Sequence, residues 1–428
     1  MVLKVLGRTW EFAMISPRII AVRLAALFLL LPLGTFAATV SAHNTGKSPH
    51  GKSPKVSESA SAQKKMSKMR HSSKTAASRN RSTHLTAKGK RRRYYERYSG
   101  NSFALDQTEG DITAGEDAMV RAAAIDALGN MNGTIVAIDP DSGRILAMVN
   151  QRMALSAGGQ PCSTIKVAVA LAALSENVIT KDTLVPLGRY YRMDLTTALA
   201  HSNNAYFEAV GRKLGFEKVS YYARQFGLGE LAGYNMAGEQ LGTFPATELD
   251  ARLGGVGKMC SFGESISLTP LQLGALMASI ANGGTLYYLQ HPTTPEEVAS
   301  FAPKVKRRLD IGPLIPEISD GMSGAVEYGT ARMLRDSFIE EPVLGKTGTC
   351  SKDGTRFGWF GSYAYTQYGR IVTVVFLEGG RPTFGPKAAE LAGRMYRNLY
   401  DHEFFAYKPI PATAEKRSAT PVSIGTTQ

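Results

Sequence analysis

Ser163 and Lys166 lie three residues apart at the start of an apolar run, residues 167–174. The Pro-containing stretch 160–162 before them is typical of a loop, and the apolar run is typical of a buried helix. The spacing therefore predicts both side chains on one face of the helix, at its first turn. A serine becomes a nucleophile when a base takes its proton. Burial and the positive end of a helix dipole both lower the pKa of a lysine, so that its amine can be neutral and act as that base. Alone the pattern is weak, because residues 61–64 repeat the spacing.

A second polar pair, Ser202 and Asn204, lies in the segment 200–207. A hydroxyl here could relay a proton between a lysine and a leaving amine, and an asparagine could hold an amide of the substrate. Ser-x-Asn by itself is not specific, since residues 99–101 and 175–177 also match it.

The third motif, Lys346-Thr347-Gly348, occurs once in the chain and falls on a predicted strand. An ammonium and a hydroxyl there could bind a substrate carboxylate, and a glycine lets a substrate backbone lie against the strand. Each motif also has an ordinary structural explanation: Ser163 could cap its helix, Asn204 could end one, and Lys346 could be a solvated charge on an edge strand. The three motifs together, in this order, are far more specific than any one of them.

The elements that would position these motifs are strands at both ends of a helical middle. Runs at 134–138 and 145–149 flank a Pro/Asp/Gly turn and predict a hairpin, and the C-terminal part predicts three more strands. This order favours an α+β fold, in which an antiparallel sheet built from both ends packs beside a helical insert. The later strands are predicted at 343–351, 357–365 and 370–377, and the helices at 116–128, in a pair within 195–214, and at 270–282, 316–333 and 386–400.

The N-terminal part of the chain differs in composition from the rest. Residues 1–42 combine a basic opening with an uncharged stretch that ends in a small-x-small pattern, which favours a secretory signal peptide over an uncleaved membrane anchor. Either way we expect an exported protein, in the periplasm or at the outer face of the cytoplasmic membrane. Residues 43–100 are nearly free of large aliphatic side chains and are expected to be a basic disordered linker, 101–408 a folded domain, and 409–428 a disordered tail.

The formal net charge of +14 belongs to the N-terminal segments. Residues 43–98 hold 16 Lys and Arg against two Glu, whereas residues 99–428 have a net charge of −3. A nucleic-acid ligand would suit the basic cluster 88–93. In an exported protein, however, a solvated tether attracted to anionic lipid or wall polymer is favoured, and no nucleic-acid partner is expected.

The three motifs in this order resemble those of the penicillin-binding protein and serine β-lactamase superfamily. The resemblance extends over about residues 115–405 and includes the first hairpin and the segments 237–245, 267–284 and 324–331. It implies a five-stranded antiparallel sheet flanked by helices, with a helical subdomain beside it and the active site between the two. It calls for no metal and no cofactor.

The resemblance also implies catalytic roles for the first two motifs. Ser163 would attack a carbonyl to form an acyl-enzyme, and neutral Lys166 would accept its proton. Ser202 would relay a proton to the leaving amine, and Asn204 would hold the substrate amide. His201 is adjacent, but these roles need no histidine, so a Ser/His/Asp triad is a poor alternative.

Substrate binding is implied for the third motif. Lys346 and Thr347 would face the substrate carboxylate, and Gly348 would let the substrate backbone approach the strand. The backbone N–H groups of Ser163 and Thr349 would form an oxyanion hole, which is worth about 3–4 kcal/mol per donor in other acyl-transfer enzymes.

The three cysteines, Cys162, Cys260 and Cys350, permit one disulfide in an exported chain and leave one thiol over. Cys162 directly precedes Ser163, where transpeptidases usually carry a small residue, and Cys350 directly follows Thr349. A disulfide between these two positions is a feature of carbapenem-hydrolysing class A β-lactamases. The resemblance thus implies a Cys162–Cys350 disulfide, with Cys260 free.

Within the superfamily, the segments around the motifs resemble those of transpeptidases. They imply a peptidoglycan D,D-transpeptidase that acts on D-Ala-D-Ala stem peptides and is inhibited covalently by β-lactams, with a D,D-carboxypeptidase as a close variant. Class A β-lactamases carry a Glu-x-x-Leu-Asn segment with a water-activating glutamate, and neither Glu239 nor Glu248 lies in one. The alternatives are a serine β-lactamase, or a penicillin-binding sensor or scaffold without turnover.

Overall fold

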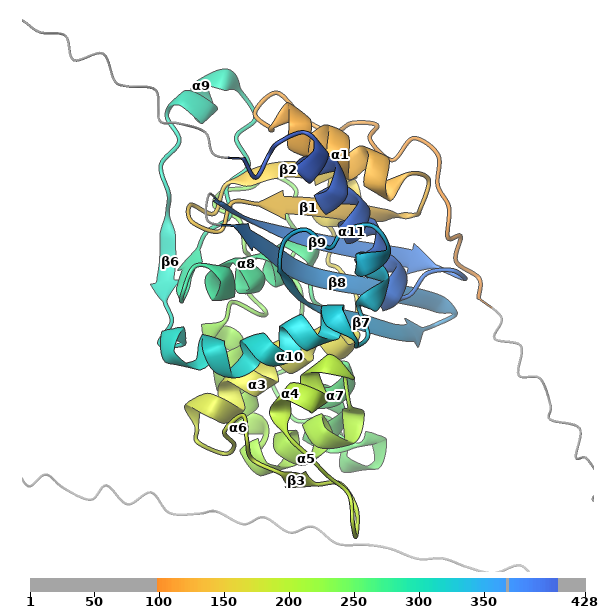
Figure 1. Ribbon diagram of the computed structural model, residues 1–428, viewed down its shortest axis with the longest axis vertical. Helices are drawn as coiled ribbons and strands as arrows, with labels where there is room; N and C mark the ends of the chain where they lie inside the picture. Colours follow the sequence, from red (N-terminus) through yellow and green to blue (C-terminus); the bar gives the residue numbers. More distant parts are fainter. Residues whose placement is uncertain (1–97, 367–368, 407–428) are drawn as a thin grey trace, which may run out of the picture. The chain divides into compact units, whose positions relative to one another are not determined.

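The computed structural model describes residues 98–366 and 369–406 (Figure 1). The expected signal peptide or anchor, nearly all of the expected linker and the tail 409–428 lie outside the described residues. The last residues of the expected linker contact the folded domain, because the Ser99 N–H donates to Gly354 O at 3.0 Å. Among the described residues, no helix is both long and apolar enough to cross a bilayer.

Five antiparallel strands form the main sheet, in the order β2-β1-β9-β8-β7 (Figure 1). The N-terminal hairpin joins the C-terminal strands through β1 and β9, so the sheet contains both ends of the domain and the predicted α+β fold is confirmed. Strands β2 and β7 form the two edges. The strands are β1 (Gly133–Ile138), β2 (Ile145–Val149), β7 (Val343–Lys352), β8 (Thr355–Thr366) and β9 (Gly369–Gly379).

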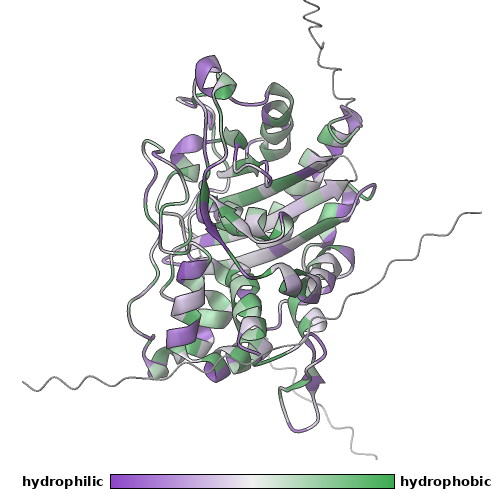
Figure 2. Cartoon of the chain, turned by 90° about the vertical axis from the view of Figure 1, so that its left-hand side faces the viewer, coloured by the Kyte–Doolittle hydropathy of each residue, from purple (hydrophilic) through white to green (hydrophobic). Residues whose placement is uncertain are grey.

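Helices cover both faces of the sheet, and the alternation of side chains along each strand supplies two separate cores. On β9, Val372, Val374 and Phe376 pack with the large helical part of the protein. Ile371 and Val375 pack instead with α1 (Ala118–Leu128) and α11 (Gly385–Asp401). A strand that is apolar on both faces reads as a continuous hydrophobic run, and Figure 2 shows hydrophobic residues over much of the sheet.

The large helical part covers the face of the sheet opposite α1 and α11, and it reaches the β7 edge. Helix α8 packs across β8 and β9, and a capping box at Thr269 and Gln272 defines its start. Helix α10 packs against α4 and β7. The remaining helices are α2 (Gln151–Ala154), α3 (Ile165–Ser175), α4 (Leu195–Ala200), α5 (Asn204–Leu214), α6 (Phe216–Gln225), α7 (Gly255–Phe262), α8 (Pro270–Ala281), α9 (Pro295–Ala299) and α10 (Ile315–Glu327), with 3-10 turns η1 (Cys162–Thr164), η2 (Ala251–Leu253), η3 (Gly312–Leu314) and η4 (Arg332–Asp336).

Three regions differ from the sequence expectations: the end of one helix and two small sheets. The helix predicted at 316–333 ends at Glu327, because the Tyr328 and Gly329 N–H groups both donate to Gly324 O and the chain then turns into η4. Two small sheets were not predicted: β3 (Val185–Pro186) pairs with β4 (Arg192–Met193), and β5 (Thr285–Tyr287) pairs with β6 (Val305–Arg308). Strands this short show no periodic pattern in sequence.

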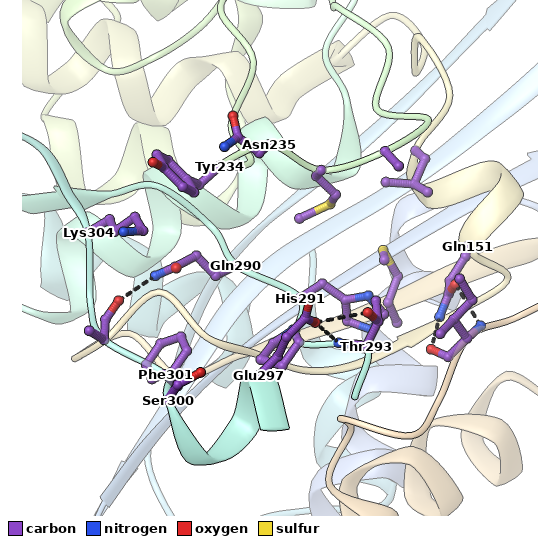
Figure 3. Close-up of a pocket in the computed structure, with 17 residues that line it drawn as sticks. Gln151, Tyr234, Asn235, Gln290, His291, Thr293, Glu297, Ser300, Phe301 and Lys304 are labelled. Atoms are coloured by element: carbon purple, nitrogen blue, oxygen red, sulfur yellow. Dashed lines mark hydrogen bonds between the residues drawn. The ribbon is translucent and has the colours of Figure 1, made fainter. Parts of the chain in front are cut away.

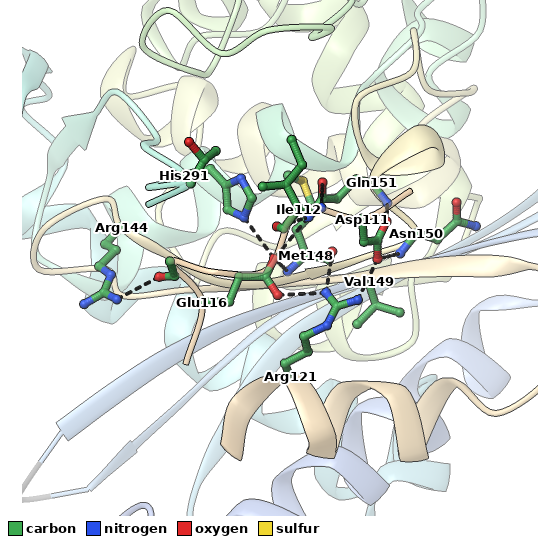
Figure 4. A network of polar contacts seen from close by, with 12 residues as sticks. Asp111, Ile112, Glu116, Arg121, Arg144, Met148, Val149, Asn150, Gln151 and His291 are labelled. Atoms are coloured by element: carbon green, nitrogen blue, oxygen red, sulfur yellow. Dashed lines mark hydrogen bonds and ion pairs between the residues drawn. The ribbon is translucent and has the colours of Figure 1, made fainter. Parts of the chain in front are cut away.

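The β2 edge of the main sheet is closed by charged side chains (Figure 4). Asp111 and Glu116 accept hydrogen bonds from the backbone N–H groups of residues 148, 150 and 151, at 2.8 to 3.1 Å. Arg121 bridges the two carboxylates at 2.9 and 2.7 Å, and His291 Nε2 lies 2.9 Å from Glu116. An edge strand presents unpaired backbone groups, and these contacts satisfy three of those at and after β2.

Candidate active site

Three segments far apart in sequence bring the motif side chains together: η1 with the start of α3, the turn between α4 and α5, and strand β7. Ser163 Oγ lies 3.0 Å from Lys166 Nζ. Ser202 Oγ lies 3.1 Å from Lys166 Nζ and 2.8 Å from Lys346 Nζ, and Asn204 Oδ1 accepts a hydrogen bond from Lys166 at 2.6 Å. The structure therefore assembles the first two motifs and the lysine of the third into one polar cluster.

The contacts around Lys166 orient its amine toward Ser163. Ser202 O (2.7 Å) and Asn204 Oδ1 (2.6 Å) can only accept hydrogen bonds from it. A neutral amine has two hydrogens and one lone pair, so these two acceptors take both hydrogens and leave the lone pair to the hydroxyls of Ser163 and Ser202. A neutral Lys166 is thus placed to accept the Ser163 proton.

Burial keeps Lys166 largely uncharged at neutral pH. Burial first, and then the nearby Lys346 ammonium, lower the pKa of Lys166 to about 6, against a weaker opposite effect of Glu208. Burial also lowers the pKa of Lys346 to about 7. Within residues 98–366 and 369–406, neither lysine forms an ion pair with a carboxylate, which would favour the charged form.

Ser163, the candidate nucleophile, lies in a 3-10 turn, whereas its spacing from Lys166 predicts the first turn of the α-helix. Ser163 belongs to η1, and α3 begins at Ile165, so Lys166 lies in the first α-helical turn. A hydrogen bond from residue 164 back to residue 161 closes the tighter turn. Cys162 and Ser202 have φ of 52° and 55°, a left-handed conformation that costs a non-glycine residue about 1–2 kcal/mol.

A disulfide joins Cys162 to Cys350, with Cα atoms 5.5 Å apart, and Cys260 is free and buried, as the resemblance implied. The disulfide connects η1 to β7. The two segments lie so close that a Cβ at Gly348 would lie 2.8 Å from Pro161 O. Glycine at this position therefore lets the segment at Pro161 and η1 approach the strand, in addition to its expected role toward a substrate.

Side chains alternate along β7 between two sides of the site. Lys346 lies on the side of the helical part, where it contacts Ser202. Thr347 and Thr349 lie on the opposite side. Thr347 Oγ1 is 2.6 Å from Thr330 Oγ1, and Thr349 Oγ1 accepts a hydrogen bond at 2.7 Å from the N–H of residue 385, at the start of α11.

Sequence reasoning missed two residues that support the cluster. Trp359 Nε1 donates to Gln160 O at 3.0 Å and so holds the loop before the nucleophile against β8. Thr330 lies in a segment that resembles the family, but no spacing linked it to β7. The ring of His201 is exposed and lies 5.7 Å from the ring of Tyr328.

A cavity of about 530 Å³ lies beside the β2 edge and is separate from this cluster (Figure 3). Its lining includes Tyr234, Gln290, His291, Phe301 and Lys304, and none of the motif residues. The polar cluster on the β7 side, not this cavity, is therefore the candidate active site.

Comparison with known proteins agrees with this geometry. The model of the penicillin binding protein transpeptidase domain matches residues 133–400. Stage V sporulation protein D of Bacillus subtilis is 28% identical over 260 residues, which cover 51% of this chain and 39% of that protein. Peptidoglycan D,D-transpeptidase MrdA of Acinetobacter baumannii is 24% identical over 383 residues, which cover 72% of this chain and 56% of that protein. The chain thus spans about half the length of these relatives or less.

Solved structures show the same fold at lower identity. The D,D-transpeptidase domain of a peptidoglycan glycosyltransferase from Eggerthella lenta superposes with a TM-score of 0.56 at 20% identity, covering 68% of this chain and 82% of that one. PBP2 of Pseudomonas aeruginosa superposes with a TM-score of 0.55 at 23% identity, covering 68% and 78%. The family model covers more than half of the chain, and the chain belongs to the penicillin-binding protein transpeptidase domain family.

Proposed function

We propose that this protein is a serine-type peptidoglycan D,D-transpeptidase, which forms an acyl-enzyme with D-Ala-D-Ala stem peptides and is acylated by β-lactams. The observation that carries the proposal is the state of Lys166. Its pKa is near 6, and its lone pair is left for hydroxyls, one of which is Ser163 Oγ at 3.0 Å. A buried neutral amine in that position is a general base for a serine nucleophile.

In the acylation step, Ser163 Oγ attacks the carbonyl carbon of the penultimate D-alanine while its proton passes to Lys166. The C–N bond to the terminal D-alanine then breaks. Ser202 Oγ lies 3.1 Å from Lys166 Nζ, so it takes the proton from Lys166 as its own hydroxyl proton passes to the nitrogen of the leaving amine. Asn204, whose Oδ1 is held by Lys166, keeps its NH₂ group for a substrate carbonyl.

Strand β7 supplies the substrate contacts in this proposal. The positive charge of Lys346 and the hydroxyl of Thr347 bind the terminal carboxylate. The N–H groups of Ser163 and Thr349 stabilise the oxyanion, and the disulfide between their neighbours holds η1 beside β7. The edge of β7 carries no further strand in the described sheet, so an extended peptide has room to lie along it.

An amine rather than water completes the reaction. The Glu239 carboxylate accepts hydrogen bonds from the Ala232 and Gly233 N–H groups, and Glu248 accepts from Val256 N–H. In the described part of the chain no carboxylate hydrogen bonds to Ser163 or to Lys166, which argues against a glutamate that activates water for hydrolysis. The acyl-enzyme then waits for the amine of a second stem peptide, which attacks the ester and returns the proton to Ser163.

The proposal also includes a location outside the cytoplasm.

Intact-mass measurement after incubation with benzylpenicillin tests the nucleophile. We expect one stable adduct on the wild-type protein and none on Ser163→Ala. Rapid hydrolysis of the drug without an adduct would indicate a β-lactamase instead. Acylation of Ser163→Ala would show that another residue is the nucleophile.

A pentapeptide ending in D-Ala-D-Ala distinguishes the possible fates of the acyl-enzyme. Release of D-alanine together with a new amide between the remaining tetrapeptide and an added amine acceptor supports the transpeptidase. Release that yields only the hydrolysed tetrapeptide indicates a carboxypeptidase. A protein that is acylated by benzylpenicillin but releases no D-alanine is a sensor or scaffold.

A further inference from the structure

We propose that Thr330 is a positioning residue that makes the site selective for substrates with a free terminal carboxylate, by orienting the hydroxyl of Thr347. This inference rests on the proposed function, in which Thr347 contacts that carboxylate. Thr330 belongs to none of the three motifs, and it lies between the end of α10 and η4.

Thr330 lies where two motif-bearing segments meet. Its Oγ1 is 2.6 Å from Thr347 Oγ1 on β7, and its backbone N–H donates at 3.1 Å to Ala200 O, two residues before Ser202. The preceding Gly329 has no space for a side chain, because a Cβ there would lie 2.2 Å from Ala200 O. Thr330 therefore links the turn that carries Ser202 to the strand that carries Thr347.

The direction of the hydrogen bond between the two threonines decides what Thr347 can do. Each hydroxyl has one hydrogen, and a carboxylate can only accept. Thr347 can therefore donate to a carboxylate only if the hydrogen between the two threonines comes from Thr330. A bound carboxylate favours the chain in which Thr330 donates to Thr347 and Thr347 donates to the carboxylate, because hydrogen bonds to charged acceptors are stronger and polarise their neighbours.

Lys346 cannot replace this directional contact. Its side chain is fully buried, and two of the three hydrogens of its ammonium are directed to Ser202 Oγ (2.8 Å) and Thr347 O (3.0 Å). The lysine supplies positive charge, and the hydroxyl of Thr347 supplies a donor of defined direction. An uncharged acceptor at the same position would gain less from that donor.

The test compares acylation by benzylpenicillin with acylation by its methyl ester, in which the carboxylate is blocked. Second-order rate constants are measured by intact mass for the wild type, Thr330→Val and Thr330→Ser. We expect Thr330→Val to lose about tenfold with the acid and less than about twofold with the ester, so that the preference for the acid falls. Thr330→Ser keeps the hydroxyl and should keep the preference.

Thr134→Val is a matched control. Thr134 is a buried threonine on β1, separated from β7 by β9 and β8, and its Oγ1 donates to Val149 O at 2.6 Å. Thr330 is partly buried, and its hydroxyl is likewise hydrogen bonded. We expect Thr134→Val to lower the melting temperature without changing the ratio of the two rates. If Thr330→Val does not fold, Thr330→Ala removes the same hydroxyl with less bulk.

The outcomes separate this inference from the proposed function. Equal losses with acid and ester, or no loss with either, would show that Thr330 does not orient Thr347 toward a carboxylate. A preference for the acid that survives in both Thr330→Val and Thr330→Ala would also overturn it. A wild-type protein that benzylpenicillin does not acylate at Ser163 would overturn the proposed function and this inference together.

Discussion

Strands β2 and β7 each have a strand partner on one side only. The buried cation beside the free edge of β2 is paired with carboxylates, whereas the buried amines beside the free edge of β7 are not. At the β2 edge, Arg121 lies between Asp111 and Glu116, and the two carboxylates also accept backbone N–H groups. At the β7 edge, Lys166 and Lys346 are both buried and both are without a carboxylate partner in the described residues.

The pKa values follow this arrangement. Burial alone would lower the pKa of Arg121, but its hydrogen bonds to Asp111 and Glu116 outweigh burial and raise it. With no such partner, burial lowers the pKa of Lys166 and Lys346 to about 6 and about 7. The paired guanidinium therefore stays charged, whereas an unpaired buried amine can be neutral near pH 7, as the proposed role of Lys166 as a base requires.

The two edges are also held by different bonds. Hydrogen bonds from the backbone N–H groups of residues 148, 150 and 151 to Asp111 and Glu116 fasten the segment 111–121 to β2, and Arg121 pairs with both carboxylates. A disulfide fastens η1 to β7. A carboxylate beside Lys166 would favour the ammonium and so remove the base. A covalent link between Cys162 and Cys350 holds the nucleophile turn in place without adding charge.

The largest effect that we expect is on catalysis at the β7 edge. Lys166→Met removes the proposed base and should slow acylation by benzylpenicillin by about 10³-fold, within the range for general-base groups. Intact mass over time measures the rate. Lys352→Met, at the exposed end of β7, is the control, and this variant should be acylated like the wild type. Near-normal acylation of Lys166→Met would show that another group takes the Ser163 proton.

At the β2 edge the largest expected effect is on stability. Arg121→Met leaves two carboxylates, with side chains 2% and 1% exposed, without their cation and should lower the free energy of unfolding by about 3–5 kcal/mol. Urea unfolding measures the change. Arg397→Met removes an exposed cation paired with Asp401 and should change the free energy of unfolding much less than Arg121→Met does. Equal costs for the two variants would contradict a special role for the buried pairs.

Loss of the disulfide should have a smaller effect on stability. The double variant Cys162→Ala/Cys350→Ala is expected to lose about 2–4 kcal/mol, the usual contribution of such a link. Reductant should lower the melting temperature of the wild type and leave that of the double variant unchanged. Because Cys260 is present in both proteins, any effect of reductant on its thiol cancels. A wild type insensitive to reductant that reaches the disulfide would contradict the prediction.

The smallest effect is the dependence of acylation on pH. The rate should fall below about pH 6, because protonation removes the lone pair of Lys166. It should also fall above about pH 7, because Lys346 loses the charge that attracts the carboxylate. One unit beyond either value the loss is about tenfold. The alkaline fall should be weaker with the methyl ester of benzylpenicillin, and an equally steep fall with the ester would assign it to a different group.

Much of the site could be predicted because each motif is local. The spacing of Ser163 and Lys166, the turn at Ser202 and the strand around Lys346 depend on residues close to them in sequence, and the structure brings all of them together. The end of α10 was predicted too late, because the chain just after it is held by a distant group: the Thr330 N–H donates to Ala200 O, and a Cβ at Gly329 would collide with that oxygen. The closure of the β2 edge was not predicted, since nothing in the spacing of Asp111 and Glu116 relates them to β2.

The α+β order of elements and the three motifs are legible in the amino-acid sequence alone, and the resemblance that the motifs carry implies the pairing of Cys162 with Cys350. The chemical state of the site depends on the folded chain. The direction of the Lys166 lone pair depends on Ser202 O and Asn204, and its pKa depends on burial and on Lys346, 180 positions away in the chain. Burial and charge act through space, so no spacing within one segment can report them.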